Sequence, residues 1–320
     1  MQSKQYTTWK HKHLIDVDDL SIQECSLIFQ LARKYENALK NRKSILPILK
    51  NSNIFNIFFE PSTRTRASFE LAGKLLGANV INITSEFSSV QKGESLEDTI
   101  KTVSSMYSDI IILRHEDSGS ATFASTNTNK SVINAGDGSH AHPTQALTDA
   151  YTIQKKFKSL KNLKVTMVGD IEHSRVARSD IWMFTKLGAK ITLCGPASLI
   201  PKSFRNSSNN KLPRVDVQTN LIKALTGADV IIALRMQTER QKKKSIPTLI
   251  EYAKRYQITK TSLQVAKKNC LLMHPGPKNE GVEISNEVAN GPLSKIEEQV
   301  ANGVVVRMAI LQLMYMKSGK

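Results

Sequence analysis

Cysteine is scarce in this sequence: its three cysteines stand far apart, at Cys25, Cys194 and Cys270. No two of them form a CxxC pair, so the sequence indicates neither a zinc site nor a disulfide framework. We expect three buried thiols in a reducing compartment. Long apolar runs are also missing, since no stretch approaches the roughly eighteen apolar residues that span a membrane. The N-terminal segment lacks an apolar core followed by a small-residue cleavage site, so we expect a cytoplasmic protein.

Aromatic residues are few, at 6% of the chain, although the formal net charge is +17. Such a charge is compatible with three interpretations: a surface that binds nucleic acid, a site for anionic small substrates, or lysines that are only solvated. Basic and aromatic side chains do not alternate in the manner that stacks nucleic-acid bases. The sequence therefore does not favour nucleic-acid binding as the primary function, and the other two interpretations stay open.

Motifs of several common enzyme classes are absent from the sequence. No GxGxxG segment follows a predicted strand and no GxxxxGK[ST] segment occurs, which argues against a dinucleotide fingerprint and a P-loop. Neither HExxH nor a cluster of histidine, cysteine and aspartate indicates a metal, and no GxSxG elbow indicates a hydrolase. We therefore expect neither a metal nor a cofactor. In an α/β protein with a phosphate site, these absences favour group transfer from a small phosphorylated substrate.

The chain has 320 residues, which is enough for two domains. Short apolar runs alternate along it with amphipathic helical patterns, which is typical of parallel sheets flanked by helices. The predicted strands are 54–59, 79–83, 109–113, 131–135, 163–168, 190–194, 229–234 and 270–273. The predicted helices are 63–77, 95–107, 143–157, 174–187, 220–225, 246–257, 262–268 and 298–316. Both halves carry their own strands, so we place a domain boundary at the helix that begins at Pro143.

The segment FFEPSTRTRASFE, residues 58–70, lies where a predicted strand passes into a helix. Such a junction brings backbone N–H groups and the positive end of the helix dipole to one point. Ser62, Thr63 and Thr65 add hydroxyl groups, and Arg64 adds a forked cation that suits phosphate oxygens. One hydroxyl would be enough for an ordinary helix cap, so we favour an anion site over a cap with a solvated arginine. The apolar face predicted for this helix consists of Ala67, Leu71, Ala72, Leu75 and Leu76.

Polar side chains recur at the ends of other predicted strands. In open parallel sheets, ligands bind outside the carboxyl ends of the strands. A strand-end arginine taken alone is usually a surface residue, and a lone histidine before a helix is often a cap. The repetition is what favours a binding site. The residues concerned are Arg114, His142, Gln145, Arg175, Arg235, Gln237 and His274.

Seven segments carry a family resemblance that runs from about Leu14 to Leu313. They are FFEPSTRTRASFE, VQKGES, LRH, HPTQAL, GDIEHSRVARS, LRMQTER and HPGP. In order and spacing they resemble the aspartate carbamoyltransferases of the bacterial catalytic-chain type. STRTR together with HPTQ is specific to the carbamoyltransferase superfamily. The KGE segment, the RxQxER segment and HPGP, where ornithine carbamoyltransferases have HCLP, indicate aspartate rather than ornithine.

The resemblance implies an enzyme that transfers the carbamoyl group of carbamoyl phosphate to L-aspartate, early in pyrimidine biosynthesis and without a cofactor. It implies a homotrimer with shared active sites, and it leaves regulatory or pathway-enzyme partners open. It also implies two domains, each a parallel sheet flanked by helices. Residues 1–142 and 291–320, including a returning C-terminal helix, would bind carbamoyl phosphate, and residues 143–290 would bind aspartate.

The resemblance further assigns roles to individual residues. Carbamoyl phosphate would be held by Ser62, Thr63, Arg64, Thr65, Arg114, His142 and Gln145, with Ser88 and Lys92 from the neighbouring chain. The catalytic residues that polarise the carbamoyl oxygen would be Thr65, Arg114 and His142. Aspartate would be bound by Lys92, Arg175, Arg235, Gln237, Gly276 and Pro277. Glu239 would orient Arg235.

Two positions depart from the pattern of these relatives. Glu280 stands where the family often has arginine, which reverses a charge near the aspartate-binding loop. Thr148 replaces a common leucine in the HPTQAL helix, which we interpret as a packing change.

Overall fold

The structure, a computed structural model, describes residues 8–84, 94–205, 212–237 and 248–317. The chain forms two compact units, one of Met1–Tyr151 with Val300–Lys320 and one of Thr152–Gln299. The first unit is discontinuous in sequence because the last helix of the chain belongs to it. Both unit boundaries lie further along the chain than the boundaries predicted at Pro143 and at residue 291.

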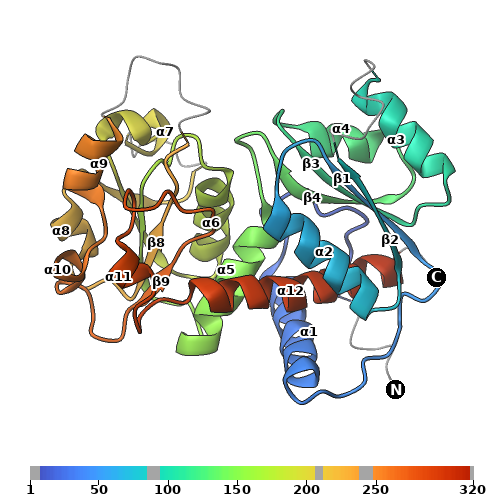
Figure 1. The fold of residues 1–320 in the computed structure, drawn as a ribbon, viewed down its shortest axis with the longest axis horizontal. Helices are drawn as coiled ribbons and strands as arrows, with labels where there is room; N and C mark the ends of the chain where they lie inside the picture. The colour runs from blue at the N-terminus through green and yellow to red at the C-terminus, as the bar shows by residue number, and fades with distance from the viewer. Residues whose placement is uncertain (1–7, 85–93, 206–211, 238–247, 318–320) are drawn as a thin grey trace. The chain divides into compact units, whose positions relative to one another are not determined.

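The first unit is built on a four-stranded sheet in which all neighbouring strands are parallel. Its strands are β1 (Asn53–Phe58), β2 (Asn79–Thr84), β3 (Ile110–His115) and β4 (Ser131–Asp137). They lie in the order β2-β1-β3-β4, which can be followed in Figure 1. β1 and β4 are buried along nearly their whole length, as expected of strands covered on both faces. The edge strand β2 is only partly buried.

Helices from both ends of the chain surround this sheet. They are α1 (Ile22–Lys40), α2 (Thr63–Leu75), α3 (Leu96–Ser105), α4 (Ser120–Thr126), α5 (Pro143–Phe157) and α12 (Ile296–Lys317). The two boundaries between the units fall within α5 and near the start of α12. One side of the sheet packs against α3 and α4 through an apolar core of Phe55, Ile57, Ile100, Val103, Ile111, Leu113, Ala124 and Val132.

α2 buries only part of the predicted face: Ala72 and Leu76 are fully buried, whereas Ala67 and Leu71 are exposed. Its buried residues are Thr65, Ser68, Phe69, Ala72 and Gly73. Leu71, predicted on the apolar face, is 48% exposed. Gly73 packs so closely on the sheet that a Cβ atom there would lie 2.7 Å from Val80 Cγ2. Close approach of the helix to the sheet, rather than a row of large apolar side chains, therefore determines how α2 packs.

α12 is buried around most of its circumference, which is typical of a helix inside a core. Arg307 lies within this apolar surface and is only 4% exposed. Burial lowers the pKa of Arg307 to about 10, although Asp149 on α5 favours its charged form. The guanidinium carbon also lies 5.0 Å from the centroid of the Phe69 ring. The buried charge is thus stabilised by a carboxylate and by the face of an aromatic ring.

The second unit is built on a five-stranded sheet, again with parallel neighbours only. Its strands are β5 (Lys164–Val168), β6 (Lys190–Cys194), β7 (Val215–Gln218), β8 (Val230–Ala233) and β9 (Leu271–Met273), in the order β7-β6-β5-β8-β9. Its helices are α6 (Arg175–Lys186), the 3₁₀ helix η3 (Ala197–Leu199), α7 (Lys202–Arg205), α8 (Leu221–Leu225), α9 (Leu249–Tyr256), α10 (Lys260–Leu263) and α11 (Asn286–Ala289). Two parallel sheets flanked by helices confirm the predicted fold class.

Candidate active site

Each unit has a point in its sheet where the chain changes direction across the strands. In the first unit the chain passes from β1 to β2 on one side, and β3 then lies on the other side of β1. In the second unit β6 and β8 flank β5 in the same way. Such switch points open a crevice at the carboxyl ends of the strands, where ligands of α/β proteins bind. The predicted site residues that the structure describes follow the carboxyl ends of strands in both units.

The N-terminus of α2 follows β1 at the switch point of the first unit. Ser62 occupies the N-cap position, yet its side chain makes no hydrogen bond that caps the helix. By contrast, Ser95 caps α3 and Ser174 caps α6 through side-chain hydrogen bonds. Thr65 is buried and Arg64 is exposed. The Ser62 hydroxyl and the helix N-terminus are therefore suited to an external anion rather than to a local cap.

Arg114 lies at the end of β3, beside the end of β1. The pairing of β3 with β4 changes register between Leu113 and His115, and such irregularities turn a side chain out of the regular sheet. Arg114 Nε lies 3.3 Å from Glu60 Oε2, and Nη1 donates to the carbonyl oxygen of Ala135 at 3.2 Å. These two contacts hold the guanidinium group in a fixed orientation. The sequence did not reveal that Glu60, inside the FFEPSTRTRASFE segment, is the partner of Arg114.

The loop from β4 to α5 carries His142, and a buried carboxylate holds this loop together. Asp137 accepts hydrogen bonds from Asn134 Nδ2 at 2.7 Å, from the Gly119 amide at 2.8 Å and from the Ala141 amide at 3.2 Å. His142 is 4% exposed and directly precedes α5. The turn after Asp137 therefore fixes the backbone from which His142 projects.

Gln145 lies in the first turn of α5 and is oriented by a neighbour on the same helix. Its Nε2 donates to Asp149 Oδ1 at 2.8 Å. Because Asp149 is fully buried, this hydrogen bond forms in a low-dielectric environment. Thr148 donates its hydroxyl to the Thr144 carbonyl oxygen at 2.7 Å, so this buried hydroxyl has a hydrogen-bond partner within the helix.

The switch point of the second unit gathers a second polar set. Gly169 directly follows β5 with φ +141°, and a Cβ atom there would lie 2.4 Å from the Leu234 carbonyl oxygen, so only glycine allows this approach. Asp170 follows and is fully buried. Arg175 is the first residue of α6 and is 5% exposed. Arg235 lies just after β8 and is half-buried.

The segment after β9 is tied to the segment after β8. His274 accepts a hydrogen bond at Nδ1 from the Gly276 amide at 2.8 Å. The backbone amide of Asn279 donates to Glu283 Oε1 at 3.0 Å, and its side-chain Nδ2 donates to the Met236 carbonyl oxygen at 3.1 Å. These hydrogen bonds fix the backbone of residues 274–279 next to the segment that carries Arg235 and Gln237.

Three predicted site residues lie outside the described residues: Ser88, Lys92 and Glu239. Glu280 accepts a hydrogen bond from Asn286 Nδ2 at 2.9 Å. In the described part of the chain, no group of three or more histidine, cysteine, aspartate or glutamate residues could hold a metal ion. No helix in these residues is long and apolar enough to cross a membrane.

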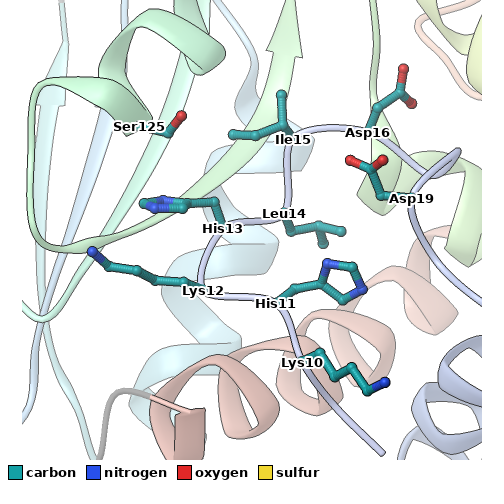
Figure 2. A pocket seen from close by; sticks show the side chains of 9 residues that line it. All are labelled: Lys10, His11, Lys12, His13, Leu14, Ile15, Asp16, Asp19 and Ser125. Atoms are coloured by element: carbon teal, nitrogen blue, oxygen red, sulfur yellow. The ribbon is translucent and has the colours of Figure 1, made fainter.

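A cavity of about 330 Å³ lies elsewhere in the first unit, along the segment that precedes α1. Figure 2 shows its lining residues, Lys10, His11, Lys12, His13, Leu14, Ile15, Asp16, Asp19 and Ser125. None of them belongs to the predicted set. The Lys10 and Lys12 side chains point in different directions, so they do not converge on one ligand.

Two sequence families match the two parts of the chain. Residues 12–155 match the aspartate/ornithine carbamoyltransferase, carbamoyl-P binding domain. Residues 161–314 match the aspartate/ornithine carbamoyltransferase, Asp/Orn binding domain. Together the two matches include nearly every residue discussed above.

Curated relatives are similar over almost the whole length. The aspartate carbamoyltransferase catalytic subunit of Dehalococcoides mccartyi is 47% identical over 305 residues, covering 95% of this chain and 92% of the relative. The subunit of the same name from a Roseiflexus species is 48% identical over 303 residues, covering 94% of each chain.

Solved structures with the same fold are less similar to this chain in sequence. Aspartate transcarbamoylase from Trypanosoma cruzi, in complex with carbamoyl phosphate and aspartate, superimposes with a TM-score of 0.87 at 28% identity, covering 96% of this chain and 98% of the other. Ornithine carbamoyltransferase from Pyrococcus furiosus gives a TM-score of 0.82 at 28% identity, covering 94% and 96%.

Proposed function

The chain belongs to the aspartate/ornithine carbamoyltransferase family, and we propose that it transfers the carbamoyl group of carbamoyl phosphate to the amine of L-aspartate. The products are N-carbamoyl-L-aspartate and phosphate, which makes the reaction an early step of pyrimidine biosynthesis. The observation that carries the choice of aspartate is the pair of arginines at the switch point of the second unit. Arg175 and Arg235, with Gln237, suit two carboxylates better than they suit a diamino acid.

The first unit binds carbamoyl phosphate in this proposal. Ser62, Thr63, Arg64 and Thr65 hold the phosphate at the N-terminus of α2, where the helix dipole favours an anion. The carbamoyl oxygen accepts hydrogen bonds from Thr65, Arg114 and His142, and the carbamoyl nitrogen donates to Gln145. The side-chain oxygen of Gln145 suits this task because its nitrogen already donates to Asp149.

The second unit binds aspartate. Arg175, Arg235 and Gln237 bind the two carboxylates, and backbone groups of the Pro275–Pro277 segment contact the amine. The Met236–Asn279 hydrogen bond supports this proposal because it holds two of these segments in one arrangement. Lys92 and Glu239, which lie outside the described residues, complete the proposed set.

Transfer needs no covalent enzyme intermediate. The neutral amine of aspartate attacks the carbamoyl carbon, and negative charge develops on the carbamoyl oxygen. Donors that are already oriented, such as Arg114 held by Glu60, stabilise this charge without reorganising. The C–O bond to phosphate then breaks, and phosphate leaves with its charge compensated by Arg64 and the α2 N-terminus. Phosphate itself can accept the proton that the amine loses.

We further propose a homotrimer in which Ser88 and Lys92 serve the site of a neighbouring chain. The exposed side of the first unit supports this, because the edge strand β2 carries no charged residue and Ile81 is 41% exposed. Leu71 on the adjacent α2 is 48% exposed. An uncovered apolar edge of this kind favours association. Regulatory or pathway-enzyme partners and the cytoplasmic location remain predictions from the sequence.

Shared sites predict recovery of activity in mixed trimers. Lys92→Ala chains and Arg64→Ala chains are each expected to be nearly inactive alone. When they are unfolded together and refolded, some sites combine an intact Lys92 from one chain with an intact Arg64 from another. Carbamoyl transfer by the mixture should exceed the sum of the two separate preparations, and a mixture without such a gain would contradict shared sites.

The proposed function is tested by assaying the purified protein with carbamoyl phosphate against aspartate and ornithine in parallel. We expect carbamoyl-aspartate and phosphate to form in equal amounts, with little product from ornithine. Turnover of ornithine but not aspartate would overturn the substrate assignment. Turnover of neither, in protein whose folding is verified by a cooperative thermal transition, would overturn the assignment as a carbamoyltransferase.

A further inference from the structure

The same local arrangement occurs at the carboxyl end of a strand in each unit. Segments 136–142 and 169–175 both begin with Gly-Asp and carry histidine three residues after the aspartate. Two residues after that histidine comes a proposed substrate contact, His142 in the first unit and Arg175 in the second. The two segments share no other residue pattern, so the structure around each aspartate–histidine pair is informative.

In the first unit the pair is Asp137 and His140. Asp137 is 1% exposed, and His140 Nδ1 lies 2.9 Å from its Oδ2 atom. Burial alone would raise the pKa of Asp137, but hydrogen bonds from His140, Asn134 and the Gly119 amide outweigh burial and lower it. The carboxylate is therefore ionised and can only accept, so His140 carries its proton on Nδ1. His140 Nε2 faces Asp16, whose Oδ2 lies 3.8 Å away.

In the second unit the pair is Asp170 and His173. Asp170 is fully buried, and His173 Nδ1 lies 2.9 Å from Oδ1 and 3.1 Å from Oδ2. The His173 backbone amide donates to the same carboxylate at 3.2 Å. The Gln237 amide approaches Asp170 Oδ2 at 3.4 Å. One buried carboxylate thus connects the turn before Arg175 to the segment after β8.

Each histidine closes its turn from the solvent side. Their side chains are 36% and 28% exposed, whereas both aspartates are buried. The imidazole therefore covers the carboxylate and ties the turn across three residues. Because the histidine fixes the backbone of the turn, the residue two positions later, His142 or Arg175, has little conformational freedom.

We propose that His140 and His173 are positioning residues that hold their turns on the buried aspartates and thereby place His142 and Arg175 for reaction. This inference rests on the proposed function. It predicts different kinetic effects for the two histidines, because the segment of His140 contacts the carbamoyl group and the segment of His173 contacts aspartate. His140 acts on the chemical step, and His173 acts on the binding of aspartate.

The kinetic test compares leucine and asparagine at both positions. His140→Leu should lower kcat about tenfold while the KM for aspartate changes by less than about twofold, because small displacements of reacting groups are costly. His173→Leu should raise the KM for aspartate about tenfold with a smaller effect on kcat. The His140→Asn and His173→Asn variants keep a donor at the same place on the side chain and should retain most activity.

His11 provides a matched control in the first unit. Its Nε2 lies 3.0 Å from Glu24 Oε1, so it also pairs with a carboxylate, but neither residue belongs to the proposed site. His11→Leu should leave kcat and KM unchanged. If both leucine variants at 140 and 173 alter the same parameter equally, or if asparagine is as harmful as leucine, the proposed positioning role is wrong.

Hydrogen exchange tests the same inference without activity. In His140→Leu the Gly119 and Ala141 amides should exchange faster, and in His173→Leu the Gln237 amide should do so. Unchanged exchange would overturn the inference even in an active enzyme. If the wild-type protein showed no carbamoyl transfer, the proposed function would be overturned instead. Hydrogen exchange alone would then show whether the two histidines hold their turns.

Discussion

Replacing Arg114 by alanine is expected to lower kcat for carbamoyl transfer by about 10²–10³-fold, the effect of removing one oriented donor from a developing oxyanion. Arg114 is held before substrate arrives by Glu60 and by the Ala135 carbonyl oxygen. The donor therefore does not lose rotational freedom during reaction. Alanine removes the charge and leaves Glu60, 16% exposed, without this cation.

Steady-state kinetics with saturating carbamoyl phosphate and aspartate measure the Arg114 effect. Lys101→Ala is the control, because Lys101 pairs with Glu97 on the exposed surface of α3, where ion pairs contribute little. Arg114→Lys should recover only part of the rate, since an ammonium group cannot contact Glu60, the Ala135 carbonyl and the substrate in the same geometry. A loss below about threefold would show that Arg114 does not act on the transition state.

Arg307→Ala is expected to reduce the free energy of unfolding by about 3–5 kcal/mol, the range found when a buried charge loses the opposite charge that compensates it. Asp149 is fully buried, so the substitution leaves its carboxylate without the opposite charge on α12. The substitution also removes a guanidinium group from the face of Phe69 and opens a cavity. Urea unfolding measures the loss as a lower midpoint at an unchanged slope.

A second variant separates the charge effect from the loss of volume. Asp149→Asn combined with Arg307→Ala removes both charges, keeps an acceptor for Gln145 and leaves the same cavity, so it should be clearly more stable than Arg307→Ala alone. Arg255→Ala, at an exposed position on α9, should cost less than about 0.5 kcal/mol. Equal losses in the single and double variants would mean that packing, not charge, explains the result.

Local sequence signals predicted helices and strands well where they were strong. The helix 143–157 has the predicted bounds because proline suits a first turn and apolar residues recur at helical spacing. The helix predicted over 95–107 begins at its first turn as expected, where Ser95 accepts a hydrogen bond from the Asp98 amide. α1 was not predicted, although a capping box formed by Ser21 and Glu24 marks its start.

Short or half-exposed elements gave weaker signals. α4, with the sequence SATFAST, is brief and polar, and β7 is only partly buried at the sheet edge. Neither was predicted, because a few residues without apolar periodicity resemble a loop. The prediction of the buried face of α2 was wrong at Leu71, because close packing of Gly73 on the sheet determines which side of the helix is buried.

The candidate site shows the same division between local and long-range information. Arg114, His142 and Arg175 could be found from sequence because they stand at strand ends beside characteristic motifs. Glu60 as the partner of Arg114, and Arg307 as the counter-charge of Asp149, could not. Those pairs join residues far apart in the chain, and only the strand order and helix packing bring them together.

The discontinuity of the first unit has a consequence for how the protein is made. Domains usually fold in the order in which the ribosome delivers them, but here residues 152–299 emerge before the first unit can be finished. Until α12 is released, Tyr35 lacks its hydrogen-bond acceptor Gln312 and Asp149 lacks Arg307. Translation that stops short of α12 should therefore yield a polypeptide whose second half folds while its first half stays open to proteolysis.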